Sequence, residues 1–209
     1  MSRPLADRMA KRALDIAGAG FGLVLLSPLL MVLAVWIRVD SPGPALYRQV
    51  RVGRRGQPFR IHKFRTMRDS TADAAGAGPA ITVGADARIT RAGAFLRRTK
   101  LDELPQLIDV LFGDMSLVGP RPEVPRYVAT YPDDVRDTLL SVRPGITDVA
   151  SLTYRDESAV LARAADPERE YREVVLPAKL RLSAEYLQRA TLASDLRLIG
   201  CTLKTLFAA

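Results

Sequence analysis

The sequence predicts an α+β chain that is predominantly helical. We expect an N-terminal re-entrant membrane segment of helix–break–helix form, a small β-hairpin or sheet, and interfacial amphipathic helices. Three observations predict this fold: a run without charge over 16–37, β-favouring residues on both sides of a turn at 53–56, and helical periodicity over 102–112 and much of 167–207. We divide the chain into the membrane hairpin with its N-terminal flank, 1–40, and a membrane-interfacial domain, 41–209.

The charge-free run from Ile16 to Ile37 is long enough to cross a membrane. Its 22 residues would extend roughly 33 Å as a helix, against a hydrocarbon core of about 30 Å. Ser27 and Pro28 lie at its middle, where proline removes a backbone donor, so we expect the helix to bend or break there. Both flanks are basic, which gives a spanning helix no preferred orientation. These features favour a segment that enters one leaflet and returns; a simple span is the alternative.

The elements that follow are shorter. Gly18 and Gly22 have the spacing of a close helix-packing face. Residues 45–67 predict a strand or hairpin region, and the small and polar residues of 69–87 predict a loop that is a surface connection or a lid. The stretch 167–207 predicts two or three amphipathic helices, which suit a protein core or a bilayer surface. Its Cys201 is the single cysteine of the chain, and we expect it to be buried.

The charge and the missing motifs narrow the function classes. The chain has 31 Lys and Arg against 23 Asp and Glu, a net charge of +8, which indicates an anionic partner: nucleic acid, an anionic leaflet or a phosphate-bearing substrate. It has no Walker A loop, no GxGxxG after a strand and no Asp-x-Asp. With one cysteine and one histidine, it offers no Cys and His cluster for a metal.

The carboxylate pair Asp102 and Glu103 is the strongest candidate for chemistry. Pro105 is tolerated only in the first turn of a helix, so we expect a helix from about Asp102 to Phe112, with both carboxylates at its positive end. There they could hold Mg²⁺ against a diphosphate, or one of them could attack phosphorus. An ordinary helix cap formed by Asp102 is the competing interpretation.

Many cations surround this pair in the sequence. Arg121 lies between Pro120 and Pro122, which stiffen the backbone and could hold a guanidinium in place for phosphate. Other cations lie before and after the pair: Arg88, Arg91, Arg97, Arg98, Lys100, Arg126 and Arg143. A solvated basic face or an anchor to anionic lipid is the alternative for any one of them.

From about residue 9 to 207 the chain resembles the monotopic phosphoglycosyl transferases, a family of bacterial sugar transferases. The matching segments are LLSPLL (25–30), KFRTM (63–67), ARITRAGAFLRRTKLDELPQL (87–107), GDMSLVGPRPE (113–123) and RPGIT (143–147). The resemblance implies that 41–209 is a cytoplasmic catalytic domain and that Ser27 and Pro28 form the break of a re-entrant hairpin at the bacterial inner (cytoplasmic) membrane. It allows a homodimer and implies no nucleic-acid partner.

The reaction implied by the resemblance has two steps. Asp102 attacks the β-phosphate of a UDP-sugar and expels UMP, and the phosphosugar then passes from Asp102 to undecaprenyl phosphate. Glu103 holds Mg²⁺, so that both dyad residues belong to the metal site. The other implied substrate-binding residues are Lys63, Arg65, Arg97, Arg98, Pro120, Arg121, Pro122, Arg143 and Arg155.

The chain also departs from the family's commonest pattern. After Gly145-Ile-Thr the family usually continues Gly-x-Ala-Gln, whereas this chain has Asp148-Val-Ala-Ser151, and Asp156 lies in a further unmatched stretch. These departures leave open the sugar, and with it the glycan pathway. The chain lacks the multi-span N-terminal extension of larger relatives, so we expect a minimal catalytic unit. Two alternatives to a phosphoglycosyl transferase remain. One is a membrane-anchored basic protein that binds lipid or nucleic acid without catalysis, and the other is a glycosyltransferase that moves the sugar alone and releases UDP.

Overall fold

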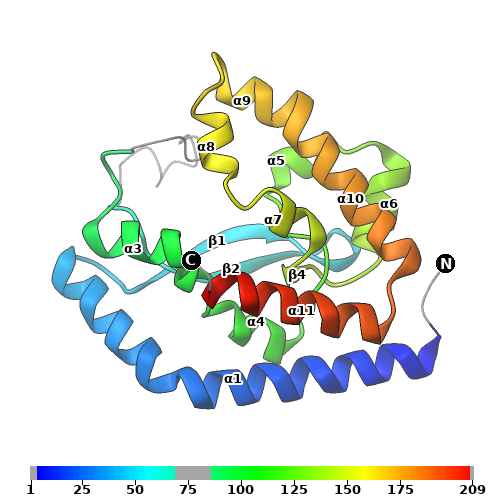
Figure 1. Ribbon diagram of the computed structural model, residues 1–209, viewed down its shortest axis with the longest axis horizontal. Coiled ribbons are helices and arrows are strands. Elements are labelled where there is room, and N and C mark those ends of the chain that lie inside the picture. The colour runs from blue at the N-terminus through cyan, green and yellow to red at the C-terminus, as the bar shows by residue number, and fades with distance from the viewer. Residues whose placement is uncertain (1–3, 69–85, 208–209) are drawn as a thin grey trace.

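A computed structural model of the chain describes residues 4–68 and 86–207 (Figure 1). The predicted loop at 69–87 lies almost wholly outside these residues. The first half of the fold contains α1 (Leu5–Asp40), β1 (Leu46–Val52), η1 (Arg54–Gly56), β2 (Pro58–Phe64), α3 (Arg91–Thr99), η2 (Leu101–Glu103), α4 (Gln106–Phe112) and β3 (Ser116–Val118). The second half contains α5 (Pro125–Val128), α6 (Asp133–Leu140), β4 (Gly145–Thr147), α7 (Val149–Thr153), α8 (Glu157–Leu161), α9 (Pro167–Glu170), η3 (Tyr171–Val175), α10 (Leu176–Arg189) and α11 (Leu192–Phe207).

The sequence predicted a bend or a break at Ser27 and Pro28, and the helix is not broken there. Helix α1 is continuous over 36 residues, with Pro28 inside it. Figure 1 shows that it bends in the second half of its length. Because Pro28 has no backbone N–H, one hydrogen bond of the helix is lost, but the turns on both sides keep theirs. The Ser27 hydroxyl donates to the Val24 carbonyl at 2.8 Å, so the serine bonds within the preceding turn.

One face of α1 packs along the whole domain. A β-carbon on Gly18 would lie 2.8 Å from Leu117 Cδ1, and one on Gly22 would lie 3.1 Å from Leu107 Cδ1, which confirms the predicted close-packing face. Towards the end of the helix, Leu33 and Ile37 are buried in a cluster that also includes residues of α3. Helix α1 therefore lies against the domain and does not project away from it.

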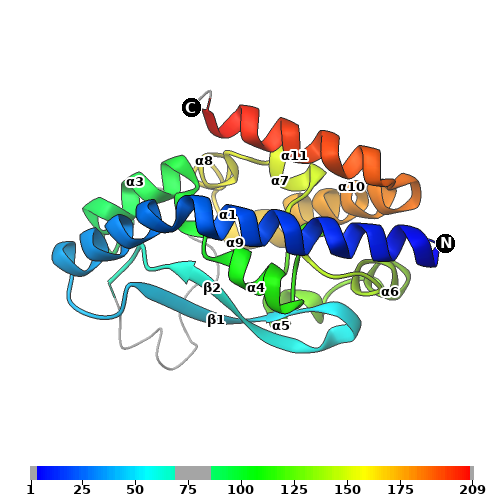
Figure 2. The same cartoon turned by 90° about the horizontal axis from the view of Figure 1, so that it is seen from below.

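The opposite face of α1 is apolar and exposed. Phe21 is 70% exposed, Val24 77% and Val39 81%, although each is a large hydrophobic residue. Figures 1 and 2 show α11 running beside α1. Cys201 on α11 is exposed, so the prediction that it is buried was wrong: this part of the amphipathic helix faces away from the core.

The predicted hairpin is confirmed. Strands β1 and β2 pair antiparallel, with Tyr47 opposite Lys63, and the turn at η1 includes Arg55 at φ 58°. Past the end of β2, Arg65 is buried, and its guanidinium donates to the Ser41 carbonyl at 2.7 Å and to the Pro42 carbonyl. Arg65 thereby binds the end of α1. A second, parallel pair of short strands, β3 and β4, was not predicted.

The C-terminal helices share a second buried cluster, against which Val52 at the end of β1 packs. Tyr127, Tyr171, Val175 and Leu176 belong to a buried cluster shared by α5, η3 and α10. The segment η3 is a π-helical turn between α9 and α10. The prediction of several amphipathic helices in 167–207 is confirmed.

The predicted helix 102–112 begins later than expected. Helix α4 starts at Gln106, while Asp102 and Glu103 lie on the preceding 3₁₀ turn, η2. The reason is Pro105, which has no N–H to donate to the Leu101 carbonyl, so the α-helical hydrogen bonds begin only after it. The apolar stripe of α4 faces α1 and solvent: Phe112 is 78% exposed, whereas Gln106 and Asp109 are buried.

Candidate active site

A cleft of about 490 Å³ lies where the hairpin, the dyad turn and the C-terminal helices meet. Strand β1 contributes Tyr47, Gln49 and Arg51, which share a face because side chains alternate along a strand. The remaining lining residues that concern the site are Lys63, Arg97, Lys100, Asp102, Glu103, Arg121, Glu123, Ser151, Arg155, Glu157, Tyr171 and Lys179. Cations and carboxylates thus share one cleft, as expected of a site for phosphate chemistry.

Asp102 has the surroundings of a reactive carboxylate. It is 2% exposed, its Oδ2 lies 2.8 Å from Lys63 Nζ, and its Oδ1 is buried with no hydrogen-bond partner. Neither η2 nor α4 has a side-chain cap, so the helix-cap interpretation of Asp102 was wrong. An unpartnered buried polar atom costs about 1–3 kcal/mol, and such an atom in a cleft is best explained by a ligand.

Glu103 is bound by two cations. The Arg121 guanidinium binds both of its carboxylate oxygens, with Nη1 3.0 Å from Oε2, and Lys63 Nζ lies 3.5 Å from Oε1. Burial acts to raise the pKa of Glu103, but Arg121 and Lys63 lower the pKa by more, so the carboxylate stays ionised. Glu103 in turn raises the pKa of Arg121. Lys63 contacts both carboxylates of the dyad and holds them side by side.

Three further cations line the cleft. Lys100 has a backbone in the left-handed region, at φ 58°, which ends α3 and turns the chain into the dyad. Burial lowers the pKa of Lys100. Arg97 and Arg155 also line the cleft, and neither forms an ion pair with another residue in the described part of the chain. Their guanidinium groups can therefore bind an anionic ligand without first leaving a carboxylate.

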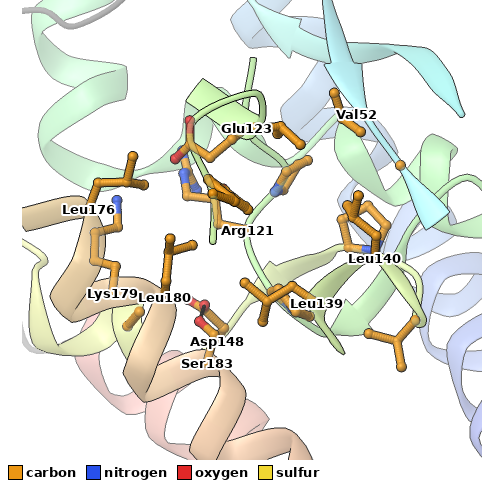
Figure 3. Close-up of a pocket in the computed structure, with 18 residues that line it drawn as sticks. Val52, Arg121, Glu123, Leu139, Leu140, Asp148, Leu176, Lys179, Leu180 and Ser183 are labelled. Carbon is orange, nitrogen blue, oxygen red and sulfur yellow. Dashed lines mark hydrogen bonds between the residues drawn. The ribbon is translucent and has the colours of Figure 1, made fainter. Parts of the chain in front are cut away.

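Some of the predicted substrate-binding residues lie outside the cleft, and others have side chains that are bonded to the protein itself. Arg65 lines the cleft but is held by the end of α1. Arg98 is absent from the lining and lies over the Phe95 ring, at 5.9 Å from its centroid. Arg143 donates to the Gly113 carbonyl at 2.7 Å. Pro120 and Pro122 line a smaller cavity behind Arg121, shown in Figure 3.

The dyad fits a hard cation only in part. The free Oδ1 of Asp102 is a suitable ligand for Mg²⁺. Both oxygens of Glu103 are already bonded by Arg121, so Glu103 could hold a metal only after Arg121 moved to another anion. No group of three or more metal-ligating side chains occurs among the residues that the structure describes. A metal here would need phosphate oxygens of a substrate to complete its coordination.

The residues at which the chain departs from the family's common pattern lie in different parts of the structure. Asp148 is buried and caps α7, where its side chain accepts from the Ser151 amide at 2.7 Å and from the Ser183 hydroxyl at 2.9 Å. Ser151 lines the cleft, and its hydroxyl oxygen is buried without a partner. Asp156 precedes α8 and is not part of the lining. Asp148 is therefore structural, and Ser151 is a candidate contact to a ligand.

Sequence reasoning missed several residues of the cleft. Arg51, Glu123 and Tyr171 form a linked group beside Arg121, and Lys179 contacts Glu157 at 2.7 Å. The alternation of the strand 46–52 and the position of Glu123 directly after Pro120-Arg121-Pro122 were the available signals for two of them. For Tyr171 no signal was available, because its place depends on a π-turn.

Comparison with known proteins identifies similar sequences. The family model for bacterial sugar transferases matches residues 6–209. A UDP-glucose:undecaprenyl-phosphate glucose-1-phosphate transferase of Escherichia coli is 35% identical over 201 residues, which cover 94% of this chain and 40% of the relative. A protein of the same name from Caulobacter vibrioides is 42% identical over 161 residues, 71% of this chain and 55% of the relative.

A third relative carries a different sugar in its name. It is a UDP-N-acetylgalactosamine-undecaprenyl-phosphate N-acetylgalactosaminephosphotransferase of Aeromonas hydrophila, 40% identical over 146 residues, which cover 69% of this chain and 34% of the relative. The chain thus spans between about a third and just over half of the length of these three relatives.

Proposed function

The chain belongs to the bacterial sugar transferase family, and on this premise we propose that it transfers a sugar phosphate from a UDP-sugar to undecaprenyl phosphate. The observation that carries the proposal is the buried, unpartnered Oδ1 of Asp102 in a cleft rich in cations. The family match and the buried carboxylate both argue against the alternative of a basic lipid-binding protein without catalysis, since such a protein needs no carboxylate of this kind. Relatives named for glucose and for N-acetylgalactosamine are similar to this chain, so we leave the sugar open.

In the first proposed step, Asp102 is the nucleophile. Its Oδ1 attacks the β-phosphorus of the donor, a carboxylate–phosphorus bond forms, the bond from phosphorus to the bridging oxygen breaks, and UMP leaves with that oxygen. Lys63 Nζ, 2.8 Å from Asp102 Oδ2, holds the carboxylate in place. Arg121, Arg97 and Arg155 neutralise the phosphates, which would otherwise repel an anionic nucleophile.

In the second proposed step, an oxygen of undecaprenyl phosphate attacks the same phosphorus. The bond to Asp102 breaks, the carboxylate is restored, and the product is a polyprenyl diphosphate sugar. Mg²⁺, if bound by Asp102 and Glu103, would supply positive charge to the diphosphate and so favour departure of UMP.

We also propose that α1 inserts into one leaflet at the cytoplasmic face of the inner membrane and does not cross it. The helix is long and apolar enough to span. However, one face of it contacts the domain near both of its ends, through Lys11 with Asp195 at 2.9 Å and through Ile37 in the cluster with α3. A helix docked over this length has only its opposite face available for lipid. Single cysteines at residues 5 and 55 should both react with an impermeant reagent from one side; reaction of only one would establish a span.

Nucleotide release tests the reaction. The full chain in lipid nanodiscs, given undecaprenyl phosphate and a panel of UDP-sugars, should release UMP with at least one of them. Asp102→Asn should reduce release by several orders of magnitude while membrane attachment and melting temperature are kept, because the amide is not a nucleophile. Asp114→Asn is the matched control, since Asp114 is exposed and outside the cleft lining.

The same assay separates the proposal from its main alternative. An enzyme that moves the sugar alone would release UDP. An unchanged rate of UMP release in Asp102→Asn would refute the assignment of Asp102 as the nucleophile. Mass spectrometry of the peptide that contains Asp102, after reaction with donor alone, should detect the added phosphosugar.

A further inference from the structure

The segment that carries Arg121 is held by a group of polar side chains that the proposed reaction does not use. Glu123, two residues after Arg121, is only 8% exposed. Its Oε1 accepts from the Tyr171 hydroxyl at 2.8 Å, and its Oε2 lies 3.6 Å from Arg51 Nη1. All three side chains line the cleft. A buried carboxylate with two such partners fixes the backbone to which it belongs.

Strand β1 holds this segment from one side. Arg51 Nη1 donates to the Pro122 carbonyl at 3.0 Å, and Nη2 donates to Gln49 Oε1 at 2.7 Å. The Val52 amide donates to the Glu123 carbonyl at 3.0 Å. The backbone on the C-terminal side of Arg121 is thus attached to the end of the strand by a main-chain bond and by an arginine.

Tyr171 holds the segment from the other side, through a single hydroxyl. The residue begins the π-helical turn η3, which interrupts the helical stretch between α9 and α10. Turns of this kind are rare and occur often at functional sites, because the inserted residue re-aims a side chain. Tyr171 is 2% exposed, and burial together with Glu123 raises the pKa of Tyr171, so that its hydroxyl keeps the donated proton.

Packing alone does not fix the rear of the segment. Figure 3 shows a cavity with Arg121 and Glu123 on one side and Leu176, Lys179 and Leu180 of α10 on another. Its volume of about 30 Å³ is enough for a water molecule and is not filled by a side chain. The hydrogen bonds of Arg51 and Glu123 therefore add to packing in setting the position of the segment.

We propose that Arg51, Glu123 and Tyr171 are positioning residues that keep the Arg121 guanidinium directed at the dyad when the donor's diphosphate replaces Glu103 as its partner. This inference rests on the proposed function, in which Arg121 binds the donor. Glu103 holds Arg121 by two hydrogen bonds in the absence of donor. Once Glu103 is released to the substrate side, the attachment of the backbone through Arg51 and Glu123 helps to set where the guanidinium can point.

A double-mutant cycle on UDP binding tests the inference. The full chain in nanodiscs is titrated with UDP for the wild type, Tyr171→Phe, Arg121→Lys and the double variant. Tyr171→Phe should weaken UDP binding about tenfold, the effect of losing one hydrogen bond to a charged group. In the Arg121→Lys background the same change should have less than a twofold effect, because Tyr171 acts through Arg121.

Two controls exclude a general loss of structure. Tyr131→Phe removes a hydroxyl from the same buried cluster, one that forms no hydrogen bond to Glu123 in the described part of the chain. This change should leave UDP binding and melting temperature unchanged. Glu123→Gln keeps an acceptor for Tyr171 and should bind UDP more tightly than Glu123→Ala. Equal weakening by Tyr171→Phe in both backgrounds would show a merely structural role and overturn the inference.

The outcomes also separate the inference from the proposed function. A wild type that binds no UDP overturns both. A wild type that binds UDP, shows the expected cycle and yet releases no UMP from any UDP-sugar overturns the proposed function and keeps Arg121 as a positioned nucleotide ligand. No weakening in Tyr171→Phe overturns the positioning inference alone.

Discussion

Replacement of Asp15 by alanine should weaken the attachment of α1 to the domain. Asp15 is 2% exposed, and its Oδ1 accepts from the Leu117 amide at 2.9 Å and from the Ser116 hydroxyl at 3.0 Å. Hydrogen bonds to a charged group contribute about 1.5–3 kcal/mol each. The Ser116 hydroxyl can turn to the Val118 carbonyl at 3.0 Å, so its loss is partly offset, whereas the Leu117 amide is left without its partner.

The expected cost of Asp15→Ala is therefore about 3 kcal/mol, a large part of an ordinary folding stability of about 5–15 kcal/mol. Asp15→Asn keeps an acceptor oxygen and should cost about 1 kcal/mol. Denaturant unfolding of the detergent-solubilised chain, followed by tryptophan fluorescence, measures both, because Trp36 lies on α1 itself. Asp7→Ala on the exposed part of the same helix is the control, with an expected cost below about 1 kcal/mol. An Asp15→Ala variant as stable as this control would refute the reasoning.

Three further predictions concern close contacts, acid stability and an unpartnered hydroxyl. Gly93→Ala should destabilise the protein by at least about 1–3 kcal/mol, because its β-carbon would lie 1.9 Å from the Thr66 carbonyl oxygen; Gly200→Ala, with open space, should not lower the melting temperature. The lowered pKa of Glu103 contributes stability that is fully present above its ordinary pKa and is lost as the pH falls through the lowered pKa. The difference in melting temperature between Glu103→Gln and wild type should therefore begin to shrink below about pH 4 and continue to shrink at lower pH. Ser151→Ala should not destabilise the protein without substrate, since the buried hydroxyl has no partner to lose; a cost above about 1 kcal/mol would reveal one.

The parts of the fold that were predictable are those with local signals. The hairpin follows from β-favouring residues around Gly53–Gly56, and the long apolar helix follows from its composition. The proline in that helix did not break it, and α1 packs against the domain before Pro28, at Gly18 and Gly22, and again after it, at Leu33 and Ile37. The start of α4 was misplaced since the sequence does not tell whether Pro105 lies inside the first turn or directly before it.

The candidate site was predictable where its residues belong to short, recognisable sequence motifs. Asp102, Glu103 and Arg121 lie together as expected, and Lys63 joins them from β2. A basic residue near the dyad in sequence is not necessarily near it in space: the Arg98 and Arg143 side chains take structural contacts elsewhere. Tyr171 reaches Glu123 across 48 positions of chain, through a π-turn that no pattern in the sequence announces.

Arg65 links two functions that are otherwise far apart in the chain. It binds Ser41 and Pro42 where α1 ends, and Lys63, two residues earlier, binds the nucleophile candidate. Two residues of extended chain cover only about 7 Å, so this part of the hairpin ties the position of Asp102 to the end of α1. If α1 inserts into one leaflet as proposed, this link holds Asp102 at a constant depth relative to the membrane surface. The phosphate of the acceptor can then react at that surface while its isoprenoid chain stays within the leaflet.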